Sequence, residues 1–163
     1  MEDEIYMRRA LELAQLAAQE NETPIGAVIV YQDQIIGEGY NKRNQLGNPL
    51  CHAEIEAIHQ AAQFMGDWRL ENCCLYVTLE PCPMCAGAIV QARIPRVVLG
   101  AMNPKAGCAG SIMNLLEEPK LNHQVQVERG LLEEESRKIM QTFFAGLRKR
   151  KDESDGKNPN EVR

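Results

Sequence analysis

The sequence lacks a hydrophobic run long enough to cross a membrane, and it lacks the basic start and apolar core of a secretory signal. Three of its first four residues, Glu2, Asp3 and Glu4, are acidic instead. Without a secretory signal, the six cysteines are expected to be thiols or metal ligands rather than disulfides. We therefore expect a cytoplasmic protein that has no membrane partner.

The sequence also lacks an excess of positive charge, because 18 basic residues face 23 acidic ones and give a net charge of −5. This balance argues weakly against a nucleic-acid partner, but phosphate binding depends on local clusters. One such cluster is Arg148-Lys149-Arg150-Lys151. These residues would suit RNA phosphates, and they would equally suit a solvated helix C-terminus.

No internal repeat or linker divides the chain, and 163 residues suffice for one domain with a sizeable core. We expect that domain over residues 1–151. Residues 152–163 are polar and contain almost no apolar side chain, so we expect a disordered tail there.

The hydrophobic pattern predicts alternating helices and strands. We expect strands over 25–31, 35–40, 74–79, 96–100 and 125–127, and helices over 5–20, 53–64, 111–117 and 132–150. A turn over 81–85 is expected to lead into a further helix that ends at about residue 93. The first two strands are close enough for an antiparallel hairpin, so the fold is α/β with a mixed sheet. Asp3 is the expected N-cap of the first helix. Gly26 marks either a bulge, which the sequence alone favours, or a close approach by another backbone or a ligand.

The segment Glu80-Pro81-Cys82-Pro83-Met84-Cys85 predicts half of a metal site. Its two cysteines are three positions apart, so both can reach one ion, and the two prolines suit the first turn of a helix. The free N–H groups and the positive dipole end of a helix start both favour the thiolates that zinc requires.

His52 and Glu54 predict the other half of this site. His52, Cys82 and Cys85 give three zinc ligands and leave a fourth position for water, as in catalytic zinc sites. Glu54 is two residues from the histidine and would transfer protons next to that water. The pattern H-x-E followed by P-C-x-x-C is typical of zinc nucleobase deaminases, in which zinc-activated hydroxide attacks a ring carbon such as C6 of adenine.

A structural zinc site is the alternative, because other cysteines are available as a fourth ligand: Cys51, Cys73, Cys74 and Cys108. Structural sites usually use two paired cysteine knuckles, which favours the catalytic interpretation. We expect Cys73 and Cys74 in the core or at its edge, and Cys51 and Cys108 near the site without binding metal. His59 and His123 are interpreted as hydrogen-bonded structural histidines.

Several segments resemble the bacterial tRNA-specific adenosine deaminases. They are His52-Ala53-Glu54-Ile55, residues 78–88, Arg93 to Ala101, Pro104-Lys105-Ala106-Gly107, Asn122-His123 and Phe143-Phe144. The deaminase motif alone would also admit cytidine or guanine deaminases, and the downstream segments favour the tRNA enzymes. The resemblance extends from about Ile5 to Lys151.

The resemblance implies a three-layer α/β/α cytidine deaminase-like fold with a mixed five-stranded sheet, one zinc ion per subunit and a homodimer. It implies deamination of adenosine to inosine at the wobble position of a tRNA anticodon stem-loop, with Glu54 as the proton shuttle. Asn41 matches an asparagine that hydrogen-bonds the flipped base. Phe144 and the basic cluster with Arg148, Lys149 and Arg150 match an RNA-contacting helix.

We expect further substrate contacts at positions beside the metal ligands and on the two nearby loops: Ala53, Pro81, Asn103 and Lys105. Lys42, Arg43 and Lys105 are the better candidates for phosphates near the target base. The main alternative function is a deaminase of free bases or nucleosides, such as guanine deaminase. The alternative from another class is a zinc-stabilised RNA-binding module without catalysis, which would not need Glu54.

Two departures from the resembled family concern the loops. Asn48-Pro49-Leu50-Cys51 precedes His52 where Asp-Pro-Thr-Ala is common, and Asn103 occupies a position where aspartate is common. An aspartate there can accept a hydrogen bond from a ribose 2′-hydroxyl while it repels nearby phosphates. Asn103 keeps the acceptor and removes the charge. Our hypothesis is that this chain discriminates RNA from DNA less sharply than its aspartate-bearing relatives.

This hypothesis predicts that Asn103→Asp raises the ratio of RNA to DNA turnover. The measurement compares deamination of matched RNA and DNA hairpins by the native chain and the variant. An unchanged ratio would contradict it.

Overall fold

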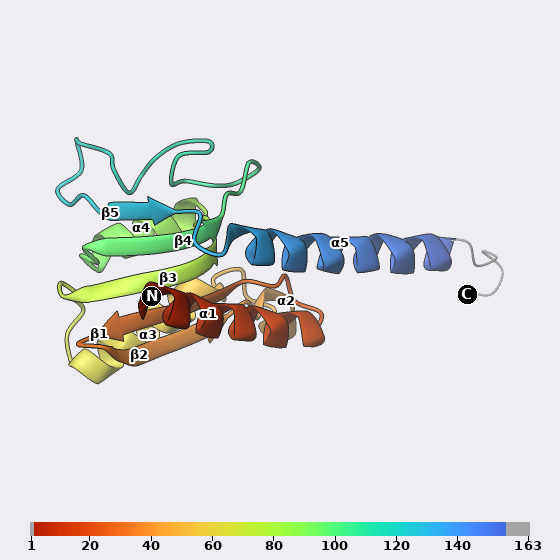
Figure 1. Cartoon of the computed structure of the whole chain (residues 1–163), viewed down its shortest axis with the longest axis horizontal. Helices are drawn as coiled ribbons and strands as arrows, with labels where there is room; N and C mark the ends of the chain where they lie inside the picture. Colours follow the sequence, from red (N-terminus) through yellow and green to blue (C-terminus); the bar gives the residue numbers. More distant parts are fainter. Residues whose placement is uncertain (1, 156–163) are drawn as a thin grey trace.

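The computed structural model describes residues 2–155 and arranges them in three layers around a five-stranded sheet (Figure 1). The strands are β1 (Gly26–Tyr31), β2 (Gln34–Tyr40), β3 (Cys73–Leu79), β4 (Arg96–Ala101) and β5 (Gln126–Arg129). The helices are α1 (Glu2–Gln19), α2 (Arg43–Leu46), α3 (Ala53–Met65), α4 (Pro83–Gln91) and α5 (Glu133–Asp155). Helices α3 and α4 cover one face of the sheet, and α1 and α5 lie on the other (Figure 1).

The sheet is mixed, as the sequence predicts. Its strand order is β2-β1-β3-β4-β5, with β1 antiparallel to both of its neighbours and the remaining pairs parallel. Strands β2, β3, β4 and β5 therefore run in the same direction, and their carboxyl ends meet at one edge. Ligand-binding sites in α/β proteins usually form at this edge of the sheet, where loops follow the carboxyl ends of the strands.

Alternate strand residues fill two separate cores, because successive side chains of a strand point to opposite faces. Ala27 and Ile29 of β1 face α3 and α4, together with Leu75, Val77, Val97 and Leu99. Val28 and Val30 face α1, together with Tyr76 and Val98. Strands that are buried on both faces are almost continuously apolar, which explains why the central strands could be found from the sequence.

Gly26 marks a close approach between helix α1 and strand β1. A methyl group at this position would overlap the carbonyl oxygen of Ala10, so only glycine allows the helix backbone to lie directly on the strand. The favoured expectation of a bulge at Gly26 is therefore wrong. The irregularity of β1 lies between Ile29 and Val30 instead.

Asp3 lies inside the first turn of α1 and is not its N-cap. Its carboxylate accepts hydrogen bonds from the Arg96 guanidinium of β4 at 3.0 and 2.7 Å and from the Tyr76 hydroxyl at 2.6 Å. The hydrogen bond with Arg96 is the main reason why the pKa of Asp3 is lowered to about 2. Asp3 thus ties the start of α1 to the sheet, a long-range role that local sequence cannot indicate.

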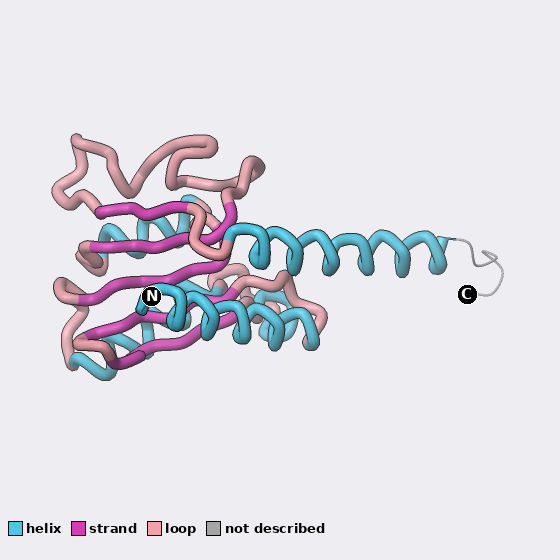
Figure 2. The backbone as a smooth tube through the Cα atoms, viewed as in Figure 1, coloured by secondary structure: helices cyan, strands magenta, loops and turns pink. Residues whose placement is uncertain are grey.

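Other boundaries also differ from the expected ones. Residues 111–117 form turns and an isolated bridge between Ala109 and Asn114 rather than the expected helix. They belong to the long irregular connection between β4 and β5 (Figure 2). Helix α5 continues to Asp155, beyond residue 151, and the remainder of the expected tail, 156–163, lies outside the described residues. No helix within residues 2–155 has the length and hydropathy to span a bilayer.

The packing at Gly26 leads to a stability prediction. Gly26→Ala should lower the free energy of unfolding by about 2–3 kcal/mol, because the added methyl group forces α1 away from β1. Gly146→Ala is the matched control. It lies inside α5 with open space around it, so it should raise the free energy of unfolding by about 0.5–1 kcal/mol. Urea unfolding measures both, and equal effects would contradict the close approach.

Candidate active site

Three side chains that could bind a metal ion converge where two helices begin on the same face of the sheet. His52 directly precedes α3 and Cys82 directly precedes α4, both with extended backbone, and Cys85 lies in the first turn of α4. The Nδ1 atom of His52 lies 3.6 Å from the Sγ atom of Cys82 and 3.6 Å from that of Cys85. Within residues 2–155, these are the His, Cys, Asp and Glu side chains grouped closely enough to hold one ion.

This donor set fits zinc in chemistry and in spacing. Zinc prefers tetrahedral nitrogen and sulfur ligands, with Zn–N about 2.0–2.1 Å and Zn–S about 2.3 Å. Tetrahedral angles would then separate the nitrogen from each sulfur by about 3.6 Å. That is the separation found between His52 and each cysteine.

The other cysteines lie outside this group of ligands. Cys73 is buried in β3 and Cys74 is partly buried beside it, which confirms their expected place in the core or at its edge. Cys108 is buried close to the site, where its backbone N–H donates to the Pro81 carbonyl. Within residues 2–155, none of Cys51, Cys73, Cys74 and Cys108 therefore joins the three donors as a fourth ligand.

The two remaining histidines have separate surroundings. The Nε2 atom of His123 donates a hydrogen bond to the Ile94 carbonyl at 2.8 Å, which confirms its structural interpretation. His59 lies exposed on α3, so the expectation that it is a structural histidine is wrong.

Local electrostatics favour a thiolate at Cys82. Hydrogen bonds from the Cys85 thiol and from His52 outweigh the effect of burial and lower the pKa of Cys82 to about 4. The same hydrogen bond between the cysteines, together with burial, raises the pKa of Cys85 far above its usual value, so the pair shares one proton. The N-termini of α3 and α4 favour negative charge at the same place.

Glu54 is a buried carboxylic acid beside the three ligands. It lies in the first turn of α3, and only 4% of its surface is exposed. Burial is the largest influence and raises the pKa of Glu54 to about 7, and the nearby charge of Cys82 acts in the same direction. A carboxyl group with a pKa near neutrality can both accept and return a proton, as general acid–base catalysis requires.

The predicted substrate loop after β2 is firmly held. The buried Asn41 side chain accepts a hydrogen bond from the Arg43 N–H at 3.3 Å. The Lys42 ammonium forms an ion pair with Glu56 of α3 at 2.9 Å and lies 4.5 Å from the centre of the Tyr40 ring. Lys42 is therefore partly neutralised and is a weaker candidate for phosphate binding than the sequence predicted.

Glu22 holds the same loop from the turn before β1. This carboxylate is completely buried, and it accepts hydrogen bonds from the backbone N–H groups of Asn44 and Gln45 at 2.9–3.2 Å. It thereby fixes the start of α2. Sequence reasoning missed Glu22, since an isolated glutamate in a turn carries no signal of burial.

The predicted substrate loop after β4 carries Asn103 and Lys105. The Asn103 side-chain oxygen accepts a hydrogen bond from the Lys105 N–H at 3.2 Å. That oxygen already stabilises the turn, and its second lone pair remains for a substrate group. Lys105 is exposed on the loop surface.

Ala53 and Pro81 are both buried immediately beside metal ligands. Ala53 opens α3, and the Pro81 carbonyl accepts the Cys108 N–H at 2.8 Å. The structure thus brings the predicted ligands, Glu54, Ala53 and Pro81 together at one edge of the sheet.

The predicted RNA contacts of α5 lie on a different layer. Helix α5 extends past the sheet on the face opposite α3 and α4 (Figure 1). Phe144 is 39% exposed and packs edge to face against Phe143, and Arg148 and Lys149 are exposed. The Arg150 guanidinium donates to the Asn21 side chain at 2.8 Å, so it links α5 to the end of α1.

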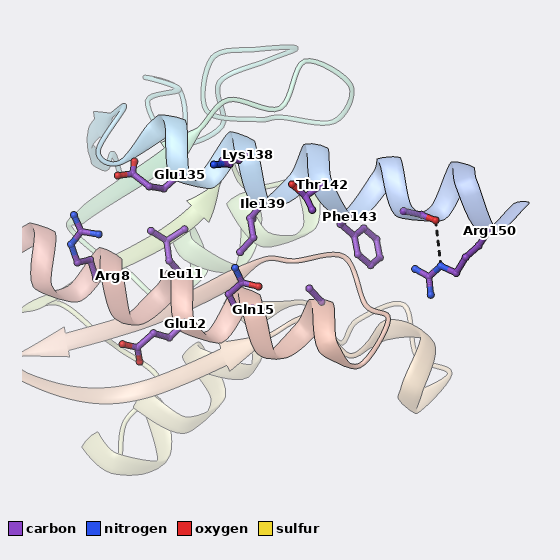
Figure 3. A pocket seen from close by; sticks show the side chains of 12 residues that line it. Arg8, Leu11, Glu12, Gln15, Glu135, Lys138, Ile139, Thr142, Phe143 and Arg150 are labelled. Carbon is purple, nitrogen blue, oxygen red and sulfur yellow. Dashed lines mark hydrogen bonds between the residues drawn. The ribbon is translucent and has the colours of Figure 1, made fainter. Parts of the chain in front are cut away.

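A groove of about 710 Å³ separates α1 from α5 (Figure 3). Its floor is apolar, with Leu11 and Ile139 facing each other, and charged side chains such as Arg8 and Glu135 form its rim. The groove is on the face of the sheet opposite the metal ligands, so it is not the site of the predicted chemistry.

Comparison with known proteins assigns the chain to a family. Residues 1–148 match the family model described as MafB19-like deaminase. The tRNA-specific adenosine deaminase of Bacillus subtilis is 49% identical over 150 residues, which cover 92% of this chain and 93% of the relative. This chain belongs to the bacterial tRNA-specific adenosine deaminases. The resemblance seen in the sequence is thereby confirmed.

Solved structures agree with the fold of this family. A structure from a study of A-to-I editing by tRNA:A34 deaminases superposes with a TM-score of 0.79 and 42% identity, covering 82% of this chain and 97% of that one. The guanine deaminase of Nitrosomonas europaea superposes with a TM-score of 0.76 at 21% identity, covering 87% of this chain and 84% of that one. At that identity the likeness concerns the fold alone.

The electrostatics of the cysteine pair predict selective alkylation of the metal-free adenosine deaminase. At pH 6, Cys82 should react with iodoacetamide at least about tenfold faster than Cys74, because Cys82 is then a thiolate whereas the pKa of Cys74 is raised by burial. Between pH 6 and 9 the rate at Cys82 should stay flat while that at Cys74 rises. Peptide mass spectrometry measures both rates. Zinc should protect Cys82 from alkylation but should not protect Cys74. Equal rates for the two cysteines at pH 6 would contradict the assignment.

Proposed function

We propose that this chain is a zinc-dependent hydrolase that converts adenosine to inosine at the wobble position of a tRNA anticodon. The observation that carries the proposal is the group of His52, Cys82 and Cys85 around the buried Glu54. The family of the chain adds the substrate, because its relatives bear the name tRNA-specific adenosine deaminase.

His52, Cys82 and Cys85 would hold the zinc ion. When bound, zinc supplies a water molecule whose pKa is low enough to provide hydroxide for attack at C6 of adenine. The two helix N-termini stabilise negative charge at the same point. Cys82 is held as a thiolate before any metal arrives, which suits it to bind the ion at neutral pH.

Glu54 is the proposed proton shuttle. It accepts a proton from the water molecule and passes it to the ring nitrogen of the base while the C6–O bond forms. It then transfers the proton of the new C6 hydroxyl group to the amino group, so that the C6–N bond breaks, ammonia leaves and a carbonyl group remains. A buried carboxyl group with a pKa of about 7 suits both directions of transfer. Asn41, Ala53 and Pro81 line the space where the base would lie, and the Asn41 amide offers the base edge both a donor and an acceptor.

We place the tRNA anticodon stem-loop across the edge where the strands end. An anticodon loop presents unpaired bases, so turning one into a pocket costs less than opening a duplex. Lys105 and Asn103 lie on the loop after β4, and Phe144, Arg148 and Lys149 are exposed on α5. These residues are the proposed RNA contacts. Arg150 would first have to release Asn21.

The chain is further proposed to act as a homodimer in the bacterial cytoplasm. Support comes from large apolar side chains that are exposed on the two loops at the same edge, namely Leu46, Leu50, Ile112 and Met113. A second copy of the chain would remove this apolar surface from water. A cytoplasmic location follows from the proposed tRNA substrate. It agrees with the six free thiols, because the cytosol keeps cysteines reduced.

Glu54→Ala provides the direct test of the proposed function. The native protein should produce inosine from a transcribed anticodon stem-loop with adenosine at the wobble position. Glu54→Ala should keep one zinc ion per subunit and lower turnover by at least about 100-fold, because the proton shuttle contributes a factor of that order. Nucleoside analysis after digestion measures inosine, and elemental analysis measures zinc.

Free guanine and cytidine serve as parallel substrates. Turnover of either one without inosine from the RNA would replace the proposed substrate and keep the zinc chemistry. A protein that holds zinc and turns over none of the substrates would favour a binding module. Substantial activity in Glu54→Ala would refute the role of Glu54, and loss of zinc would make Glu54 a ligand or structural residue.

A further inference from the structure

Glu80 is a buried carboxylate that the metal chemistry does not use. It directly precedes Pro81 and Cys82, and only 2% of its surface is exposed. Its Oε1 atom accepts the Asn103 N–H at 2.8 Å and the Ser111 hydroxyl at 2.5 Å. Its Oε2 atom accepts the Ala109 N–H at 2.8 Å and the Ser111 N–H at 3.0 Å.

All four of these hydrogen bonds come from one loop, residues 102–111, which follows β4. The loop therefore curls around the Glu80 carboxylate, and a fifth bond, from the Cys108 N–H to the Pro81 carbonyl, continues the attachment. Gly107 completes the fit, since a methyl group there would overlap the carboxylate. The loop touches the chain at the two residues directly before the metal ligand Cys82.

The surroundings of Glu80 suit a buried carboxylate. Each of its two oxygens accepts two hydrogen bonds, so four donors of one loop surround the group. A buried carboxylate is tolerated only where such donors surround it.

We propose that Glu80 is a positioning residue, which fixes the loop carrying Asn103 and Lys105 relative to the metal ligands and thereby aligns the RNA substrate for deamination. The proposal rests on the proposed function for its substrate. Glu80 itself faces the loop and does not reach the reacting atoms. Because only Pro81 separates Glu80 from Cys82, the hydrogen bonds to Glu80 and to the Pro81 carbonyl attach the loop directly beside the candidate metal ligand.

Glu80→Gln tests the proposal with almost no change in size. A glutamine has one acceptor oxygen, so two of the loop donors must face its NH₂ group. If the NH₂ group replaces Oε1, it faces the Asn103 N–H and the Ser111 hydroxyl, and the hydroxyl can rotate to accept a hydrogen bond from it. If it replaces Oε2, it faces two backbone N–H groups that cannot accept. The first orientation of the glutamine amide is therefore less costly, and it leaves the Asn103 N–H without an acceptor. Hydrogen–deuterium exchange at the amide of Asn103 should accelerate by at least about tenfold, whereas amides in β3 and β4 should keep their protection.

The same variant should keep its zinc and lose activity. We expect kcat/KM for the anticodon stem-loop to fall by about 100-fold, the effect of misplacing a substrate by about 1 Å. Most of the loss should be in kcat, with KM raised by only about threefold, since the RNA keeps its contacts along α5. Glu71→Gln is the matched control. It removes the same charge from an exposed turn before β3 and should change none of these quantities.

Gly107→Ala provides a second test from the loop side. It leaves Glu80 intact but displaces the loop from the carboxylate, so it should reproduce both the faster exchange at Asn103 and the loss of kcat. This variant decides the matter if Glu80→Gln fails to fold.

Three outcomes would overturn the proposal. They are unchanged exchange at Asn103, faster exchange with kcat/KM within about twofold of the native value, and loss of zinc from Glu80→Gln, which would make Glu80 a support of the metal ligands. If the native protein produces no inosine, the proposed function fails. Unchanged exchange in both variants would then still refute the anchoring, because exchange is measured without substrate.

Discussion

The candidate site depends on two helices starting at the same place. Strands β2 and β3 run in the same direction on either side of β1, so the helices that follow them begin at one edge and bring His52 to Cys82 and Cys85. Close packing fixes the height of α3, because a methyl group at Gly39 would overlap the Ala53 carbonyl. A shift of that helix along β2 would separate the histidine from both thiols, since ligand spacing tolerates only tenths of an ångström.

Two buried carboxylates extend this rigidity to the loops at the same edge. Glu22 binds backbone N–H groups of the loop after β2, and Glu80 binds those of the loop after β4. Loops usually have unpaired backbone groups in contact with water and are mobile for that reason. Here each buried carboxylate accepts hydrogen bonds from several backbone N–H groups at once. Glu22 thereby holds the start of α2, and Glu80 holds residues 103–111.

The sequence predicted those parts of the molecule that depend on local pattern or fixed spacing. The β-branched runs predicted the strands. The C-x-x-C and H-x-E spacings predicted the three donors that the structure brings together, with Glu54 beside them. It failed where one residue acts across the fold. Aspartate is a residue type that often caps helices, but Asp3 forms an ion pair with Arg96 instead. Gly26 lets helix α1 pack closely on strand β1 and does not form a bulge. The local sequence gave no indication that Glu22 is buried. It showed Glu80 only as a residue next to the two cysteines. The burial of both side chains depends on segments that are distant in the sequence.

Substrate choice has to come from what surrounds the shared core. The guanine deaminase of Nitrosomonas europaea has the same fold at 21% identity. A fold by itself does not determine function. A chain with a net charge of −5 does not attract RNA through its overall electrostatic field. Any attraction must come from local groups of positively charged side chains. Lys105 on the loop held by Glu80, and Arg148 and Lys149 on α5, are exposed cations placed in this way. Under the proposals above, these cations have different roles. Lys105 would help to align the target base near the candidate metal site, and α5 would retain the rest of the RNA. The alignment would require a loop that is fixed relative to Cys82, and the hydrogen bonds to Glu80 hold the loop there.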